Sequence, residues 1–167
     1  MKKQVILKKI FLFNRRGTGR KTQKIKNKMI KIVLDTNVII SGLGWEGNPR
    51  KIVNFWKTGK IILCISAKVL NEYIEVLERN IIPANDYKWF IRLIEEKKNI
   101  EIVKPKKHFN VVKEDPDDNI FLDCGIESNV KYIITGDEHL LKLKKFDSIK
   151  IVSPVKFLKI ARGLKFL

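Results

Sequence analysis

The stretch KIVLDTNVIISGL, residues 31–43, decides the fold because a fully apolar run in it ends abruptly at a charged residue. The run Ile32–Leu34 is short, branched and uninterrupted, which is typical of a strand buried within a sheet. Asp35 closes the run, and a carboxylate at the end of a buried strand seldom serves stability. The stretch therefore predicts a buried strand that carries a functional carboxylate to one edge of a sheet.

Outward from this stretch, short apolar runs alternate with longer runs of helical spacing. The predicted strands are residues 31–35, 61–65, 100–103, 131–135 and 149–152. The predicted helices are residues 49–58, 67–79, 86–98, 117–129 and 137–143, with a last helix opened by Pro154. This alternation predicts an α/β fold in which helices cover both faces of a parallel sheet. In such sheets a ligand binds beyond the carboxyl ends of the strands.

Acidic residues gather at that predicted edge. Asp35 ends the first strand, and Asp137 closely follows another in KYIITGDEHLLKL, residues 131–143. Between them, the run EDPDD at 114–118 opens a helix whose amino end should point to the same edge. We therefore expect Asp35, Asp137 and at least one of Asp117 and Asp118 to converge.

Converging carboxylates imply a particular chemistry. Two of them 4 Å apart repel by about 4 kcal/mol at an effective dielectric constant near 20, so one is protonated or a cation holds both. Oxygen ligands without nearby histidine or thiolate favour Mg²⁺ or Mn²⁺ over zinc. An acidic pocket also repels phosphate unless a metal reverses its sign. Metal-assisted phosphodiester hydrolysis satisfies both requirements.

Each acid also has a purely structural interpretation. Asp115 before Pro116 is typical of a helix cap, as is Ser66 before the helix at 67–79. Asp117 and Asp118 can complement the helix dipole, and Asp137 can be another cap. Helical periodicity leaves three glutamates undistinguished on the solvated face of the 67–79 helix: Glu72, Glu75 and Glu78.

The charge is uneven along the chain. The net charge is +17, and residues 1–28 carry eleven Lys or Arg and no acid. We expect these residues to form a basic extension that is disordered or ordered only on a partner, with Met29 as an alternative start of the protein. Apolar stretches are far shorter than the roughly 20 residues that cross a bilayer. Without a cleavage site or a second cysteine pair beyond Cys64 and Cys124, the sequence predicts a cytoplasmic protein with two buried free thiols.

Three stretches resemble the PIN-domain family in their order and spacing. They are KIVLDTNVIISGL, SAKVLNEYIEVLER at 66–79, and DPDDNIFLDCGIESNVKYIITGDEHLLKL at 115–143. The ending IKIVSPVKFLKI at 149–160 is also similar to the branch of toxins in toxin–antitoxin pairs. The resemblance covers residues 30 to about 161, so the expected domain is 29–167.

This resemblance implies a three-layer α/β/α sandwich with a central parallel sheet, Mg²⁺- or Mn²⁺-dependent RNA cleavage, frequent homodimers and an antitoxin partner. It implies four catalytic acids, of which all but the glutamate are metal ligands: Asp35, Glu72, Asp118 and Asp137. It also implies supporting roles for Thr36, Asn37 and Thr135. Asp117 remains a rival to Asp118 by one register step.

Two other classes of protein compete with this interpretation. A haloacid-dehalogenase-type phosphatase needs a second aspartate two residues after the first, where this chain has Asn37. A non-catalytic RNA-binding or RNA-processing factor that retains the PIN fold is the main alternative, although the presence of all four acids argues against a degenerate site.

Overall fold

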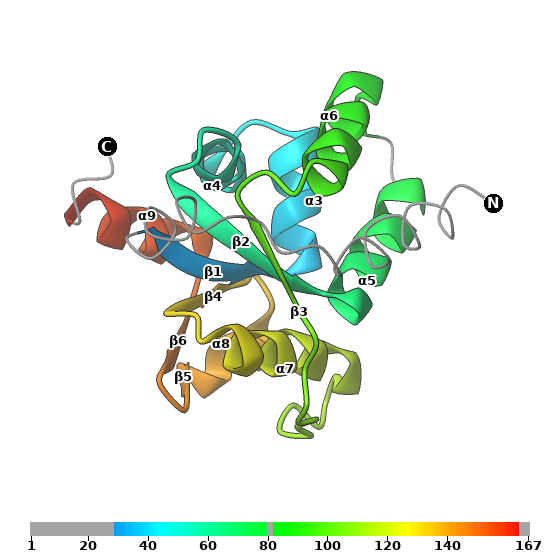
Figure 1. Ribbon diagram of the computed structural model, residues 1–167. Coiled ribbons are helices and arrows are strands. Elements are labelled where there is room, and N and C mark those ends of the chain that lie inside the picture. Colours follow the sequence, from blue (N-terminus) through cyan, green and yellow to red (C-terminus); the bar gives the residue numbers. More distant parts are fainter. Residues whose placement is uncertain (1–28, 80–81, 164–167) are drawn as a thin grey trace, which may run out of the picture.

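A six-stranded sheet forms the middle layer of the protein (Figure 1). The computed structural model describes residues 29–79 and 82–163. The strands are β1 (Ile30–Leu34), β2 (Ile61–Ser66), β3 (Ile100–Val103), β4 (Tyr132–Ile134), β5 (Lys145–Phe146) and β6 (Ile149–Val152). Their order across the sheet is β3-β2-β1-β4-β6-β5, and every neighbouring pair is parallel except β5 and β6.

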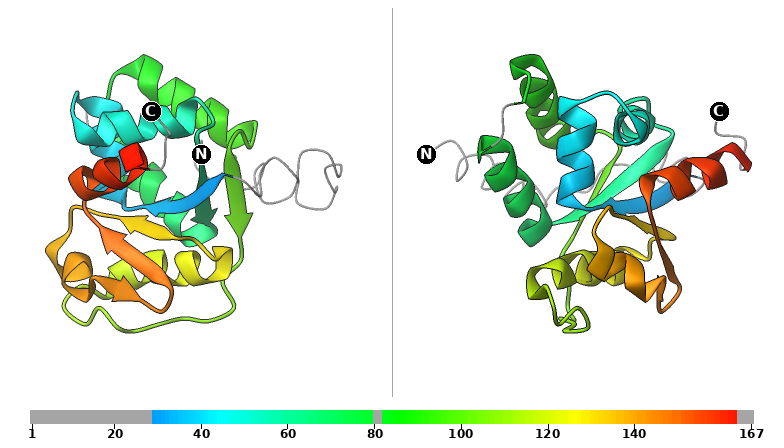
Figure 2. Two further views of the ribbon diagram at one scale, coloured as in Figure 1. Left: turned by 90° about the vertical axis from the view of Figure 1, so that its left-hand side faces the viewer. Right: turned by 180° about the vertical axis from the view of Figure 1, so that it is seen from behind.

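Helices cover both faces of this sheet. They are α3 (Thr36–Gly44), α4 (Asn48–Lys57), α5 (Ala67–Arg79), α6 (Ala84–Glu95), α7 (Asn119–Ser128), α8 (Glu138–Leu143) and α9 (Pro154–Gly163), with a short 3₁₀ helix, η2 (Pro116–Asp118), before α7. Helices α3 to α6 lie on one face and α7 and α8 on the other, while α9 packs beside α4 (Figures 1 and 2). The predicted three-layer α/β/α sandwich is therefore confirmed.

All five predicted strands are present, and the structure adds two elements. Helix α3 begins one residue after β1 and buries Val38, Ile39 and Leu43, and no glycine or proline between the two elements marks the change from strand to helix spacing. Strand β5 is only two residues long and pairs antiparallel with β6. The prediction of a wholly parallel sheet is therefore wrong at this edge. The helix predicted from residue 117 begins instead as η2, where the Asp115 carboxylate accepts a hydrogen bond from Asp117 N at 3.3 Å.

The core lies between the sheet and the helices. Trp56, Tyr73 and Phe90 are fully buried, and their rings meet edge to face with centroids 6.0 and 6.3 Å apart. Cys64 and Cys124 are buried free cysteines, as predicted. No helix in the described part of the chain has the length and apolar character needed to cross a membrane. The predictions for residues 1–28 concern residues outside the described part.

A glycine lets α3 and α4 approach each other closely. A Cβ added at Gly42 would clash with Val53 Cγ2 and lie 2.9 Å from the carbonyl oxygen of Pro49. At Gly44, two residues on in the same helix, the nearest atom would be Ile82 Cδ1 at 3.2 Å, the end of a flexible side chain. The packing of α4 against the helix that follows Asp35 thus depends on Gly42.

We predict that Gly42→Ala destabilises the protein while Gly44→Ala does not. Overpacking costs about 1–3 kcal/mol, which exceeds the gain of roughly 1 kcal/mol from the better helix propensity of alanine. Urea unfolding should give a lower midpoint for the first variant and an unchanged or higher one for the second. Equal midpoints for the two variants would contradict the close approach at Gly42.

Candidate active site

The carboxyl ends of the two central strands open into one acidic cavity of about 500 Å³. Strands β1 and β4 are direct neighbours, with Leu34 opposite Ile134, so the residues that follow them emerge side by side. Helix α5 and the segment around η2 complete the walls. The acidic residues that line the cavity are Asp35, Glu72, Glu75, Asp115, Asp117, Asp118 and Asp137. All four residues proposed as catalytic acids therefore face one space.

Asp35 is the most buried of these acids, with 3% of its surface exposed. Its Oδ2 accepts a hydrogen bond from the Thr135 hydroxyl at 2.6 Å, and its Oδ1 accepts one from the backbone N–H of Asn37 at 3.1 Å. The second bond makes Asp35 the cap of α3. One carboxylate therefore joins the end of β4 to the start of α3.

Asp137 is held by the same threonine. Its backbone N–H donates to Thr135 Oγ1 at 2.8 Å, so that hydroxyl bridges the segments bearing both aspartates. Asp137 Oδ1 also accepts hydrogen bonds from the backbone N–H groups of His139 and Leu140 at 2.7 and 3.2 Å. Asp137 is therefore a helix cap and a cavity residue at once, and the two interpretations do not exclude each other.

Glu72 enters the cavity from α5. It accepts a hydrogen bond from the Thr36 hydroxyl at 2.5 Å through its Oε1. The next residue, Tyr73, is fully buried and donates its hydroxyl to the carbonyl oxygen of Leu34, which fixes α5 beside the end of β1. Glu75 also lines the cavity, whereas Glu78 is exposed and is not part of its wall. The packing thus distinguishes glutamates that periodicity could not.

Asp117 and Asp118 differ in their surroundings. Asp117 is exposed, whereas Asp118 is partly buried. Asp118 Oδ2 is shielded from solvent and has no hydrogen-bond partner among the described residues. A buried, unpaired carboxylate oxygen is costly, so this atom is the one most in need of a ligand. The comparison favours Asp118 over its neighbour.

Two comparisons with known proteins bear on this geometry. The sequence pattern of the PIN domain matches residues 31–139. This chain belongs to the PIN-domain family. It is also similar to the uncharacterized protein MJ1680 of Methanocaldococcus jannaschii, with 32% identity over 151 residues that cover 83% of this chain and 94% of the relative. Membership suggests nuclease activity in general, and PIN domains generally use divalent metal ions.

The acids of this PIN domain are poorly compensated. Burial raises the pKa of Asp118 to about 7, and repulsion from Asp35 and Asp137 adds to the effect. Burial also raises the pKa of Asp35, against the hydrogen bond from Thr135, and that of Glu72, against the one from Thr36. Lys68 and Arg79 also line the cavity, but the pKa of Asp118 remains raised in their presence. The cavity therefore disfavours full ionisation of its acids.

The donor set fits a hard divalent cation, but the side chains are not closed around one. Carboxylate oxygens dominate the cavity, and Asp118 Oδ2 has no hydrogen-bond partner in the part of the chain that the structure describes. Within residues 29–79 and 82–163, however, no three His, Cys, Asp or Glu side chains are arranged to hold a metal ion as they stand. An ion held here by fewer than three side chains would take its remaining ligands from water.

Two structural residues of the site escaped sequence reasoning, and both belong to α7. Asn119 is 5% exposed and accepts from the backbone N–H groups of Val111 and Val112 at 2.8 and 3.0 Å. Asp123, one turn on and also 5% exposed, accepts from His108 Nδ1 and Phe109 N, each at 2.8 Å. Together they fasten the loop that leads to Asp118. The sequence signal that could have identified Asn119 and Asp123 is their spacing of four residues, which places two polar side chains on the buried face of a helix.

We predict that Asp118→Asn stabilises the metal-free protein at alkaline pH. Since the pKa of Asp118 is raised in the folded state, that state binds more protons than the unfolded chain between pH 3.8 and about 7. Stability therefore falls as pH rises through this window, and an uncharged amide removes that loss. The melting temperature should rise by a few degrees at pH 8, where about 1 kcal/mol corresponds to roughly 2–4 °C, and change little at pH 4.

Asp117→Asn is the matched control because it removes the same charge from the exposed neighbour. Thermal melting of both variants and the wild type, in chelator and across the pH window, makes the comparison. An equal gain from the control would mean that overall charge, rather than the burial of Asp118, is responsible.

Proposed function

We propose that this PIN domain is a Mg²⁺- or Mn²⁺-dependent endoribonuclease that hydrolyses RNA phosphodiester bonds. The observation that carries the proposal is the convergence of four acids on one cavity, two that follow β1 and β4 and two from α5 and η2, where Asp118 Oδ2 is buried without a partner among the described residues. Such a cavity has little use in a purely structural protein, because its acids repel one another and raise the pKa of Asp118.

Asp35, Asp118 and Asp137 are the proposed metal ligands. When bound, the metal would lower the pKa of a water molecule and neutralise charge on the phosphate. The Thr135 hydroxyl holds Asp35 Oδ2 and, through the N–H of Asp137, keeps both aspartates at the same mouth of the cavity. Asp35 cannot rotate freely, because Asn37 N holds its other oxygen.

Glu72 is proposed to position the attacking water. Thr36 holds Glu72 Oε1, so Oε2 is the oxygen left to accept a hydrogen bond from that water. The raised pKa of Glu72, caused mainly by burial, favours acceptance of a proton at this carboxylate. In-line attack by water leaves a 5′-phosphate and a 3′-hydroxyl. Thr36, Asn37 and Thr135 act here as supporting residues.

We further propose that the protein is the toxin of a toxin–antitoxin pair. The support is the similarity of residues 149–160 to that branch of the family. An antitoxin partner, a homodimer and a cytoplasmic location follow from the same proposal. The PIN domain is taken to span residues 29–167, with the basic segment 1–28 outside it. Co-purification from the native host tests the partner, and repeated recovery of the free protein would count against it.

We predict that the wild type cleaves labelled single-stranded RNA in Mg²⁺ or Mn²⁺ and that a chelator abolishes cleavage. Asp35→Asn should lower the rate by about 100-fold or more, because loss of a metal ligand removes several kcal/mol of stabilisation at about 1.4 kcal/mol per tenfold. Asp147→Asn is the matched control, since Asp147 is exposed on the β5–β6 turn and its positive φ of 52° suits asparagine.

The ends of the products test the mechanism separately from the activity. A 5′-phosphate and a 3′-hydroxyl are expected, whereas a 2′,3′-cyclic phosphate would indicate a metal-independent reaction. Equal cleavage by the wild type and Asp35→Asn would point to a contaminant or to a different site. RNA binding without cleavage by the wild type would favour the alternative, a non-catalytic RNA-binding or processing factor.

A further inference from the structure

A second cavity, of about 510 Å³, lies beside the acidic one. It sits at the carboxyl ends of β2 and β3, where Ser66 and Val103 are the last strand residues. Its walls are mainly apolar and come from three separate segments: Ala67, Ile102, Val103, Pro105 and Ile120. This volume is within the range of roughly 300–1,000 Å³ that is usual for small-molecule sites.

The two cavities share part of their walls. Lys68 and Ile120 line both of them, and both open at the same edge of the sheet. The sheet order β3-β2-β1-β4 puts the acidic cavity over β1 and β4 and the apolar one over β2 and β3. Two strand spacings, about 10 Å, separate the centres of these pairs. Neighbouring nucleotides of one extended strand can therefore occupy both cavities.

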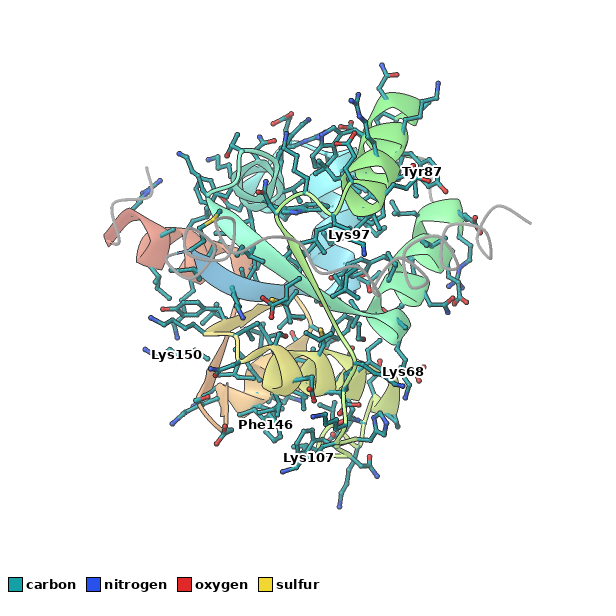
Figure 3. The ribbon with its side chains drawn as sticks, in the orientation of Figure 1. Lys68, Tyr87, Lys97, Lys107, Phe146 and Lys150 are labelled. Carbon is teal, nitrogen blue, oxygen red and sulfur yellow. The ribbon has the colours of Figure 1, made fainter. Side chains whose placement is uncertain are left out.

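Two lysines and one carboxylate contribute to the wall of the apolar cavity. Lys68 and Lys104 are exposed, whereas Asp123 is buried and is held by His108 and Phe109. Figure 3 shows Lys68 at the base of α5, above the loop that carries Lys107. A phosphate that spans the boundary between the cavities would meet the ammonium group of Lys68. This arrangement of charge suits an anionic ligand with an apolar part.

His108 adds a polar group that is already oriented. Its Nδ1 lies 2.8 Å from the buried Asp123 Oδ2, while 62% of the side chain is exposed. A carboxylate accepts hydrogen bonds, so Nδ1 is the donor and Nε2 is the nitrogen left for a ligand. The cavity thus combines aliphatic walls with an oriented imidazole.

We propose that this cavity receives the base of an unpaired RNA nucleotide next to the phosphate that is cleaved, with Lys68 holding the intervening backbone. The proposal rests on the nuclease function proposed above. A nucleobase has apolar faces and a polar edge, which match the walls and the imidazole, and its phosphate matches the lysines. A base paired in a duplex cannot enter, so the substrate is single-stranded where it is cut.

Binding can be measured without catalysis. We expect AMP, titrated into the ¹⁵N-labelled full chain and followed by amide chemical shifts, to perturb residues 66–68, 102–108 and 120–123. Ribose 5-phosphate has the same phosphate and no base, and it should bind at least about tenfold more weakly if the apolar walls contribute as burial of a ring implies. Equal affinity for the two compounds, or shifts confined to other regions, would overturn the proposal.

A matched pair of variants tests the location. Ala67 and Ala84 are both exposed first residues of helices, α5 and α6, and a glutamate at either position is favourable to the helix dipole. Ala67→Glu introduces a carboxylate at the mouth of the apolar cavity and should weaken AMP binding by about tenfold or more. Ala84→Glu should leave it unchanged. Equal effects of the two variants would reject this location.

The dinucleotide ApA distinguishes an RNA site from a free-nucleotide site. On the Asp35→Asn variant in Mg²⁺, which should cleave at least about 100-fold more slowly than the wild type, ApA should bind more tightly than AMP and should also shift the amides of Thr36, Asn37 and Asp137 in the acidic cavity. AMP binding as tight as that of ApA would mean a free-nucleotide site and would overturn the RNA assignment. Since these are binding measurements, a failure of RNA cleavage would reject the nuclease function while leaving the result for the cavity to stand on its own.

Discussion

The carboxylate of Asp35 is the constraint on which the rest of the site depends. It is almost fully buried, and a buried carboxylate must be hydrogen-bonded or neutralised. Its partners are the Thr135 hydroxyl and the Asn37 backbone, so its solvation is tied to the pairing of β1 with β4 and to the start of α3. The compensation is incomplete, because burial still raises its pKa. The same group thus organises three elements and leaves the cavity in need of positive charge.

The segment before α7 shows how the fold holds a repelled acid in position. Asp118 faces Asp35 and Asp137, which raise its pKa together with burial, so the loop would relax outward if it were free to do so. Asn119 prevents this through its side-chain amide. Its Oδ1 accepts a hydrogen bond from the backbone N–H of Val112, and its Nδ2 donates to the carbonyl oxygens of Val112 and Pro116. The neutral amide does this without adding another charge. Stability around the site is therefore supplied by a side chain that does not face the cavity chemistry.

Much of the fold was predictable because the spacing of apolar residues marks the strands and helices, and their alternation along the chain implies a parallel sheet. Buried strands are recognised as short apolar runs, and parallel topology then brings the residues after β1 and β4 together, including Asp35 and Asp137. Helix α3 was missed because it starts one residue after the strand, with no glycine or proline between the two elements to mark a turn. Periodicity does not separate Asp118 from Asp117 or Glu72 from Glu78, and the prediction of Asp118 and Glu72 came from the family resemblance. The packing adds that Glu78 lies outside the cavity wall. The second cavity had no sequence signal, because its walls come from residues in three distant segments.

The bond between Thr135 and Asp35 joins residues 100 positions apart. Translation proceeds from the amino terminus, so a nascent chain holds Asp35, Glu72 and Asp118 well before Thr135 and Asp137 have left the ribosome. Strand β4, which must pair with β1 to bring them in, is made about 100 residues after β1. A nascent chain shorter than 135 residues therefore lacks the hydroxyl that orients Asp35, and the acidic cavity can assemble only after Thr135 and Asp137 have been made. The long-range pairing of β4 with β1 therefore delays the formation of the acidic cavity during synthesis.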